Sequence, residues 1–507
     1  MPAPGAAHAH RKRRTTDLPA SARLAVVMNF AREIVDAAPP ARRALLELAR
    51  DGSRREWSFG EVADRSARLA GTLQRHGINK GDTVMTLIGN RPEWVLAMVA
   101  CFRIGAVVLP CNEQLRAHDL QLRLDAAAPK LILVDERDAD ELEAAGPAAR
   151  VLTIPDEALY AHPPAPAVDL HPSDPCLIVF TSGTSGEAKG IVHGQRYLPG
   201  QRLQAEHWLS AREGDLVWCT AASGWSKSAR NAFIAPWLRG ATAMLHDTRF
   251  DPAQRLELLA AEGVNVLCMA PTEYRVIAKR ATLSPLPKLR TLVAAGEALN
   301  PEVLRAFNDV LGIEIRDGYG QTETGQLTSN PFGRPARPGS MGLPLPGVDL
   351  RIDDGELVLA DPRTDPTFFV RYLDDSGPAP EDQPWRTGDR VHQDEDGYLY
   401  FEGRADDVII SAGYRIGPFE VESALVSHPA VAEAAVVAAP DDERGAVVRA
   451  VVVLRDGFAA GETLATELQD HVKHQTAPYK YPRIVEFAAE LPKTTSGKVR
   501  RALLRDQ

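Results

Sequence analysis

Short apolar segments alternate with amphipathic ones along much of the chain, and this alternation restricts the fold more than any other feature. Between residues 53 and 135, helical patterns at 59–76, 92–103 and 117–127 alternate with strand patterns at 83–89, 106–110 and 131–135. The alternation resumes after residue 190, with expected strands at 216–220, 242–246, 264–269 and 289–294 and expected helices at 230–238, 252–262, 272–280 and 301–311. Helices between consecutive strands are typical of βαβ units, so the sequence predicts two α/β sheets.

The pattern changes twice further along the chain. From 337 to 403, short strands at 348–352, 356–360 and 398–402 alternate with Gly, Pro and Asp turns, which predicts a small β-barrel. Beyond 404 we expect a small α+β unit with helices at 418–426 and 464–474 and strands at 431–437, 447–454 and 483–488. A chain of 507 residues exceeds one ordinary core. We therefore expect a disordered tail over 1–20, a core over 21–403 and a smaller unit over 409–507, joined by the short segment 404–408.

Two local expectations concern connections. The Ala- and Pro-rich stretch 144–170 is predicted to be a long connection on the surface. Asn300 is the expected N-cap of the helix that begins at Pro301.

Composition excludes several classes of protein. The net charge of −10 argues against a nucleic-acid binder. No stretch could span a bilayer, because the best candidate, 94–110, is interrupted by Arg103 and Gly105 and is better interpreted as a core helix leading into a strand. The basic N-terminus lacks the apolar segment of a secretory signal. The five cysteines form no C-x-x-C pair, and His471 and His474 have no partner ligands nearby, which favours a reduced, cytoplasmic protein without a zinc site.

One loop has the composition of an anion-binding nest. It follows the expected strand 176–180 and reads F-T-S-G-T-S-G-E-A-K-G. Its glycines allow consecutive N–H groups to face one point, and its hydroxyls add donors, which suits a polyphosphate. The spacing is not that of a Walker A loop, and a flexible surface loop is the alternative. The candidate ligands are Thr181, Ser182, Gly183, Thr184, Ser185, Gly186 and Lys189.

Five further motifs follow later in the chain. They are D-G-Y-G-Q-T-E-T-G at 317–325, T-G-D at 387–389, G-R-A-D-D at 403–407, S-A-G-Y-R-I at 411–416 and L-P-K-T-T-S-G-K-V-R-R at 491–501. With the loop above, they resemble the adenylate-forming superfamily, which includes acyl-CoA synthetases, coumarate–CoA ligases, luciferases and peptide-synthetase adenylation domains. The resemblance runs from about residue 50 to residue 507. It implies a large N-terminal domain of two α/β sheets plus a small β-barrel, with a small mobile α+β C-terminal cap.

The resemblance also implies roles for single residues. Tyr319 is expected to stack on adenine, Thr322 to contact the α-phosphate or the substrate carboxylate, and Glu323 to hold Mg²⁺. Asp389 and Arg404 are expected to bind the ribose. The remaining expected nucleotide contacts are Gly296, Glu297, Ala298, Asp317, Gly318, Gly320 and Arg415.

The C-terminal motifs have implied roles in catalysis and in movement. Lys498 is the expected catalytic lysine, because a lysine on a terminal loop can neutralise charge that develops at the α-phosphate. Asp406 occupies the family's hinge position, so 404–408 is the expected hinge. The expected contacts to coenzyme A are Ser411, Ala412, Gly413 and Tyr414.

The acid-binding segment departs from the family. Within 221–240, a G-W pair and a later P-W-x-x-G resemble the medium-chain and acetyl-type branch, so Trp225 is expected to wall the acyl pocket. Lys227 and Arg230 replace the usual small or apolar residues, and buried cations need partners. The partner could be a protein carboxylate, the phosphates of coenzyme A or a substituent on the acid; an outward-facing side chain is the alternative. The Asp with which amino-acid-activating relatives hold the ammonium is not visible, which argues against an amino-acid substrate.

Taken with these motifs, the resemblance implies an ATP-dependent acid–CoA ligase for a medium-chain or aromatic carboxylic acid. ATP, Mg²⁺ and coenzyme A are the implied cofactors. The chain stops nine residues after Lys498, which favours free coenzyme A over an attached carrier domain. An acyl-AMP ligase that serves a separate carrier protein and a non-catalytic nucleotide-binding homologue are the alternatives, and a homodimer is the candidate assembly.

Overall fold

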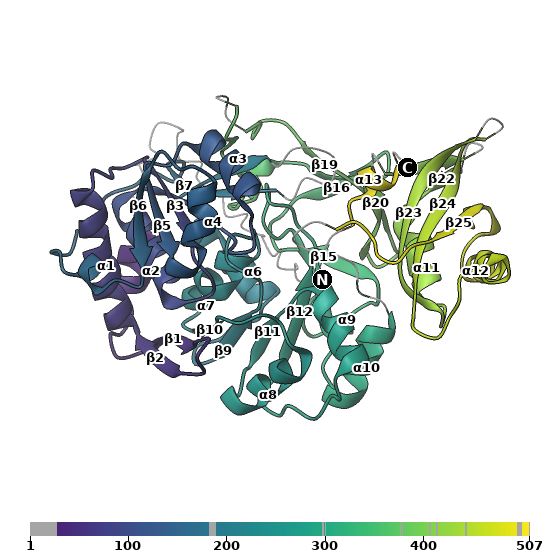
Figure 1. The fold of residues 1–507 in the computed structure, drawn as a ribbon, viewed down its shortest axis with the longest axis horizontal. Helices are drawn as coiled ribbons and strands as arrows, with labels where there is room; N and C mark the ends of the chain where they lie inside the picture. Colours follow the sequence, from purple (N-terminus) through teal and green to yellow (C-terminus); the bar gives the residue numbers. More distant parts are fainter. Residues whose placement is uncertain are drawn as a thin grey trace, which may run out of the picture.

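The computed structural model places the chain in two parts of unequal size (Figure 1). It describes residues 28–181, 189–296, 299, 301–375, 377, 379–404, 407–411, 414–441, 444–493 and 499–505. The predicted disordered tail, 1–20, and the predicted N-cap, Asn300, lie outside these residues. Two α/β sheets and a smaller antiparallel sheet form the larger part, and the segment after residue 407 forms the smaller one.

The first sheet has the strand order β18-β8-β7-β4-β3-β5-β6. Its parallel strands are β3 (Thr83–Leu87), β4 (Val107–Cys111), β5 (Leu131–Asp135), β6 (Arg150–Ile154) and β7 (Pro175–Phe180), and its antiparallel edge is β8 (Gly190–Gly194) with β18 (Arg371–Tyr372). The helices between these strands are α1 (Phe59–Arg75), α2 (Pro92–Ile104), α3 (Ala117–Ala127) and α4 (Ala139–Ala144). At the start of α1, Ser58 and Glu61 form a capping box.

The second sheet has the order β13-β12-β11-β9-β10-β1-β2. Its strands are β1 (Arg43–Leu48), β2 (Arg54–Ser58), β9 (Leu216–Cys219), β10 (Thr242–His246), β11 (Val266–Cys268), β12 (Thr291–Ala295) and β13 (Ile315–Gly318). All pairs are parallel except β1 with β2. The helices after residue 190 are α5 (Tyr197–Gly200), α6 (Arg202–His207), the π-helix η5 (Arg230–Ile234), α7 (Ala235–Leu238), α8 (Pro252–Glu262), α9 (Pro271–Arg280) and α10 (Pro301–Leu311). The two predicted α/β sheets are thus confirmed.

The main hydrophobic core lies between the two sheets. One cluster of buried side chains includes residues from both sheets and from α1, α2, η5 and α7. Trp94 meets Phe233 edge-on, with ring centroids 5.7 Å apart, and Phe233 meets Trp237 at 5.0 Å. Every residue of α2 except Glu93 is buried, and the helix is apolar on nearly all sides, as expected for a helix between two layers. The prediction of a core helix that leads into a strand at 94–110 is therefore confirmed.

The predicted small β-barrel is present as a half-barrel. It is an antiparallel sheet in the order β14-β15-β20-β19-β17-β16. The strands are β14 (Thr328–Ser329), β15 (Ser340–Pro344), β16 (Leu350–Asp353), β17 (Glu356–Leu359), β19 (Trp385–Gln393) and β20 (Leu399–Arg404). Because β20 ends at Arg404, the sheet leads directly to the predicted hinge segment.

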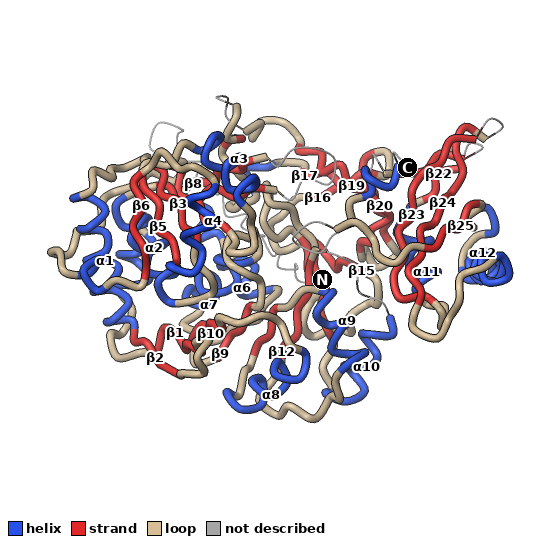
Figure 2. The backbone as a smooth tube through the Cα atoms, in the orientation of Figure 1, coloured by secondary structure: helices blue, strands red, loops and turns tan. Residues whose placement is uncertain are grey.

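The C-terminal part is the predicted α+β unit (Figure 2). A hairpin of β21 (Ile409–Ser411) and β22 (Tyr414–Ile416) precedes α11 (Pro418–Val426). The strands β23 (Val431–Asp441), β24 (Gly445–Leu454) and β25 (Ile484–Phe487) form one sheet, with α12 (Glu462–Gln475) and α13 (Arg501–Arg505) beside it. A separate hydrophobic cluster lies between α11, α12 and this sheet. The domain boundaries at 404–408 stay a prediction.

One expectation about the fold is wrong. The stretch 144–170 is not a surface connection throughout, because it contains β6 and a 3₁₀-helix at Glu157–Tyr160. Leu159, Tyr160 and Ala165 are buried against the main core. The sequence pattern did not predict β6, because it is an edge strand whose side chains are mostly exposed and it therefore lacks a continuous apolar run.

Other expectations concern single side chains. All five cysteines are buried free thiols, as predicted. The His471 Nε2 atom lies 2.8 Å from the Ser427 hydroxyl, and His474 Nδ1 lies 2.6 Å from the Asp470 carbonyl. Within the described ranges, no helix is long and apolar enough to cross a membrane.

Candidate active site

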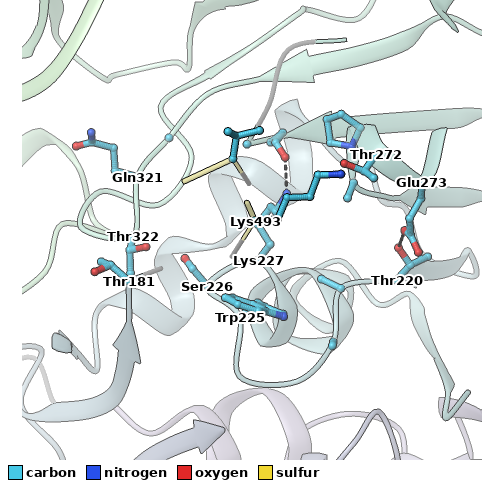
Figure 3. Close-up of a pocket in the computed structure, with 18 of the residues that line it drawn as sticks. Thr181, Thr220, Trp225, Ser226, Lys227, Thr272, Glu273, Gln321, Thr322 and Lys493 are labelled. Carbon is cyan, nitrogen blue, oxygen red and sulfur yellow. Dashed lines mark hydrogen bonds between the residues drawn. The ribbon is translucent and has the colours of Figure 1, made fainter. Parts of the chain in front are cut away.

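A cavity of about 1940 Å³ opens where the carboxyl ends of the second sheet face the half-barrel and the C-terminal unit. Ligands of α/β proteins commonly bind at the carboxyl ends of parallel strands. The loops after β9, β11, β12 and β13 contribute side chains to its wall, and Figure 3 shows residues of several of these loops around a common space. Most of the described residues that the motifs predicted line this one cavity.

The predicted adenine and ribose residues form a closed hydrogen-bonded cluster. The Tyr319 hydroxyl donates to Asp389 Oδ2, and Gln321 Nε2 donates to the same oxygen at 2.9 Å. Arg404 Nη1 lies 3.1 Å from Asp389 Oδ1. Burial raises the pKa of Asp389, although Arg404 and the two donors favour its ionised form. Gln321 was not predicted, although it stands inside the motif that the sequence singled out.

Hydrogen bonds to its carbonyl oxygens hold the T-E-T segment, 322–324, which follows β13. The Phe369 N–H donates to the Glu323 carbonyl at 2.8 Å, and Thr367 Oγ1 donates to the Thr324 carbonyl at 2.5 Å. A Cβ at Gly320 would lie 1.7 Å from the carbonyl oxygen of Gly325, so the turn requires a glycine at this position.

Glu323 has the surroundings of a cation ligand. Burial raises the pKa of its carboxyl group, and among the described residues no cationic group lies within ion-pair distance. The Tyr372 hydroxyl donates to Glu323 Oε1 at 3.4 Å, and Lys189 Nζ lies 5.5 Å from the Tyr372 ring centre. A buried carboxylate without a cationic partner fits a hard divalent ion. Tyr372 was not predicted, because no motif marks it.

The two ends of the phosphate-loop candidate are joined. Thr181 N donates to the Lys189 carbonyl at 2.9 Å, and Lys189 N donates to Thr181 Oγ1 at 3.1 Å. Both residues line the cavity. Several predicted residues lie outside the described part of the chain, namely Ser182, Gly183, Thr184, Ser185, Gly186, Glu297, Ala298, Asp406, Ala412, Gly413 and Lys498, together with the side chain of Arg415.

Of the two motifs in the C-terminal unit, 411–416 and 491–501, the second contributes residues to the cavity wall. Lys493, Val499 and Arg501, on either side of the segment that carries Lys498, line the cavity, and Lys493 pairs with Val499 in an antiparallel bridge. Ser411 and Tyr414, the two described residues of the segment predicted for coenzyme A, do not line it. Tyr414 is 52% exposed, and its ring stacks on that of Tyr479 with centroids 4.3 Å apart.

The predicted acid-binding residues Trp225 and Lys227 both line the cavity. Lys227 Nζ donates to the carbonyl oxygen of Ala295, the last residue of β12 (Figure 3). On the same wall, Glu273 accepts from the Thr220 hydroxyl and pairs with Arg255 Nη2 at 3.2 Å. On this wall, Arg255 therefore has a carboxylate partner, whereas Lys227 has a neutral carbonyl.

Arg230 lies deeper than Lys227. It is 4% exposed, and its Nε and Nη1 atoms have no hydrogen-bond partner among the described residues. Burial lowers the pKa of nearby His193 to about 3, and the Arg230 charge adds to this shift. Burial raises the pKa of Asp365 to about 7, and there the charge of Arg230 acts in the opposite direction. His193 and Asp365 were not predicted, because isolated buried polar residues leave no pattern in a sequence.

Comparison with known proteins decides the family. The model of the AMP-binding enzyme family matches residues 32–363, and that of the AMP-binding enzyme C-terminal domain matches residues 420–498. The chain belongs to the AMP-binding enzyme family. This confirms the predicted membership of the adenylate-forming enzymes.

Individual relatives agree with this assignment. The chain is 40% identical over 525 residues to Acyl-coenzyme A synthetase ACSM4, mitochondrial, of Rattus norvegicus, covering 94% of this chain and 90% of the relative. It is 38% identical over 494 residues to the uncharacterized acyl–CoA ligase YtcI of Bacillus subtilis, with 92% and 93% covered. The crystal structure of the anthranilate CoA ligase AuaEII in complex with anthranoyl-AMP superposes with a TM-score of 0.83 at 28% identity, over 95% of this chain and 97% of that one.

Proposed function

We propose that this protein is an AMP-forming acid–CoA ligase, which activates a carboxylic acid with ATP and transfers the acyl group to coenzyme A. The observation that carries the proposal is the single cavity shared by four features. These are the Asp389 cluster, Glu323, the two residues that flank the Lys498 segment and the Trp225–Lys227 wall. Family membership supports the same activity.

In the first step, a carboxylate oxygen of the acid attacks the α-phosphorus of ATP, and pyrophosphate leaves. We assign Asp389 and Arg404 to the ribose and the Tyr319 ring to the adenine, which the cluster that these residues form supports. We assign Lys189 and Thr322, which line the same cavity, to the phosphates. Glu323 would hold Mg²⁺ together with the nucleotide phosphates, and the ion would neutralise phosphate charge. Lys498 is the proposed donor to the charge that develops at the α-phosphate.

In the second step, the thiol of coenzyme A attacks the acyl carbon, and AMP leaves. Ser411 and Tyr414, the described residues of the segment proposed for coenzyme A, do not line the cavity, whereas Leu491, Lys493, Val499 and Arg501 do. We propose that the C-terminal unit turns about Asp406 between the steps, exchanging one segment for the other.

The finer assignments are proposals as well. A medium-chain or aromatic acid is the proposed substrate. The name of the anthranilate CoA ligase supports an aromatic acid, and the resemblance of the G-W and P-W-x-x-G segments supports a medium-chain one. An acyl-AMP ligase that serves a separate carrier protein is the alternative. The homodimer and the cytoplasmic location stay predictions, and the rat relative is named a mitochondrial protein.

The test is pyrophosphate release over a panel of carboxylic acids, measured with and without coenzyme A. The proposal expects acid-dependent release, with AMP and an acyl-CoA thioester formed in equal amounts when coenzyme A is present. Stable acyl-adenylate without thioester would favour the acyl-AMP ligase. The absence of acid-dependent release over the whole panel would overturn an activating enzyme.

A further inference from the structure

Lys227 places a positive charge on the wall where the acid is expected to bind. It stands two residues after Trp225 in the loop that follows β9, and its side chain reaches across to the end of β12. There its ammonium group donates to the Ala295 carbonyl, and it would lie 3.0 Å from a Cβ built on Gly296 (Figure 3). The alternative of an outward-facing side chain is therefore excluded.

The charge of Lys227 has no carboxylate partner within ion-pair distance among the described residues. Glu273 is the carboxylate on the same wall, and it already accepts from Thr220 and pairs with Arg255. An ammonium group has three donors, and here one of them is used by a neutral carbonyl. Lys227 lines the cavity, so its remaining two donors are available to a ligand there.

Binding of an acid changes this balance. A plain alkyl or aryl tail that fills the space beside Trp225 displaces the water from the ammonium group and offers no acceptor in return. An acid with a second oxygen acceptor replaces the lost water with a charge-assisted hydrogen bond. A site built to hydrogen-bond a substrate discriminates strongly against an analogue that lacks the group, because its own polar atoms are left unpaired.

We propose that Lys227 selects carboxylic acids that carry a second oxygen acceptor, either a carboxylate or a ketone, on a short apolar body. This inference rests on the proposed ligase activity and names the class of acid that it uses. Arg230 also lines the cavity, but it is 4% exposed and lies beside His193 and Asp365, so Lys227 is the more accessible of the two cations.

The experiment compares acids that are matched in length. The two sets are pentanoate, 4-oxopentanoate and glutarate, and hexanoate, 5-oxohexanoate and adipate. Initial rates of acyl-CoA formation give kcat/KM for each acid with the wild type and with Lys227→Met, which keeps the length of the side chain and removes its charge. We expect the wild type to have a higher kcat/KM for the two oxygenated acids of each set than for the plain acid. Lys227→Met should lower kcat/KM by about 10- to 100-fold for the oxygenated acids and leave it unchanged or raise it for the plain acid.

Two further variants make the result specific. Lys227→Arg keeps the charge and should keep the preference for the oxygenated acids. Lys279→Met removes another lysine that lines the same cavity, from the last turn of α9, and should leave the ratio between matched acids unchanged. Melting temperatures of all variants separate misfolding from a change in selectivity.

The remaining outcomes overturn the inference. An equal loss on plain and oxygenated acids would place Lys227 at the reacting carboxylate or in the scaffold. A rise in the KM for coenzyme A alone would assign it to the thiol substrate, and an unchanged profile would make it structural. A wild type that forms thioesters only with plain acids refutes the selection but leaves the ligase activity intact, whereas no thioester with any acid refutes the ligase itself.

Discussion

The two sides of the cavity differ in how completely their polar groups are paired. On the nucleotide side, both oxygens of Asp389 are occupied, by Tyr319 and Gln321 on one and by Arg404 on the other. On the acid side, Lys227 has a single neutral acceptor, and two nitrogens of Arg230 have no partner among the described residues. The Asp389 cluster is thus organised before any ligand binds, whereas the acid side, like buried Glu323, holds charge whose partner must come with a ligand.

This difference has a physical reason. ATP is the same for every member of the family, so its binding groups can be held in one arrangement by one another, which reduces the cost of ordering them on binding. The acid varies between members, and a site that discriminates among acids needs polar groups that the correct acid alone satisfies. Four predictions test or sharpen the contrast.

The largest expected effect concerns Lys498 and asks whether the paired nucleotide side is sufficient for the first step. Lys498→Ala should lower ATP-dependent pyrophosphate release by about 100- to 1,000-fold, because one electrostatic contact to the α-phosphate is lost. The variant should still convert a supplied acyl-adenylate and coenzyme A into thioester. If both half-reactions fell equally, Lys498 would not be specific to adenylation.

The second prediction breaks the nucleotide cluster at its centre. Asp389→Asn removes the charge that Arg404 pairs with, and it should lower kcat/KM for ATP by about 10- to 100-fold while the KM for the acid changes little. Steady-state kinetics with each substrate varied in turn measure this. Asp361→Asn, which removes a carboxylate that pairs with exposed Arg363, is the matched control and should change neither constant. A larger effect on the acid than on ATP would contradict the division of the cavity.

The third prediction compares two arginines that are both 4% exposed. Arg103 pairs with Asp36, whereas Arg230 has no ion-pair partner among the described residues. Arg103→Met should therefore lower the free energy of unfolding by about 1–3 kcal/mol, and Arg230→Met by less than about 1 kcal/mol, because removing a buried charge that lacks a partner also removes its desolvation cost. Denaturant unfolding measures both, and a loss at Arg230 as large as that at Arg103 would show that it is paired.

The smallest expected effect is a pH dependence at Asp365. Burial raises the pKa of this carboxyl group from 3.8 to about 7, so its protonation stabilises the fold fully below about pH 3.8, and that contribution is lost as the pH rises through 7. Asp365→Asn should therefore become more stable relative to the wild type by about 1 kcal/mol between pH 6 and pH 7. A constant difference in the free energy of unfolding across this range would refute the raised pKa.

The same contrast explains what could be predicted from the sequence. The helix at 117–127 and the strand at 131–135 were predicted to the residue, because buried strands and amphipathic helices leave regular patterns. The assignment of Tyr319, Asp389 and Arg404 to one nucleotide site followed from the motifs, whereas their hydrogen bonds to one another did not. The strand β2, with its polar R-R-E-W-S sequence, the edge strand β6 and buried His193 and Asp365 could not be predicted, because they depend on contacts between distant segments rather than on a local pattern. The roles of Lys227 and Arg230 stayed open at that point because only the fold shows the contacts that each of them makes in the cavity.

The position of β1 in the second sheet has a consequence for the order of folding. Its neighbours β10 and α7 follow far behind in the chain, and the Trp237 indole donates to the Ala44 carbonyl across 193 residues. A ribosome that adds about 5–20 residues per second needs about 10–40 s to deliver that partner. During this time, Leu45 and Leu46, which are fully buried in the finished protein, lack their partner strand β10 and have only elements nearer in the chain, such as β2 and α1, to cover them. The acid-side wall, which depends on β9 to β12, can therefore be completed only after residue 295 has been made and the hairpin of β1 and β2 has docked against β10.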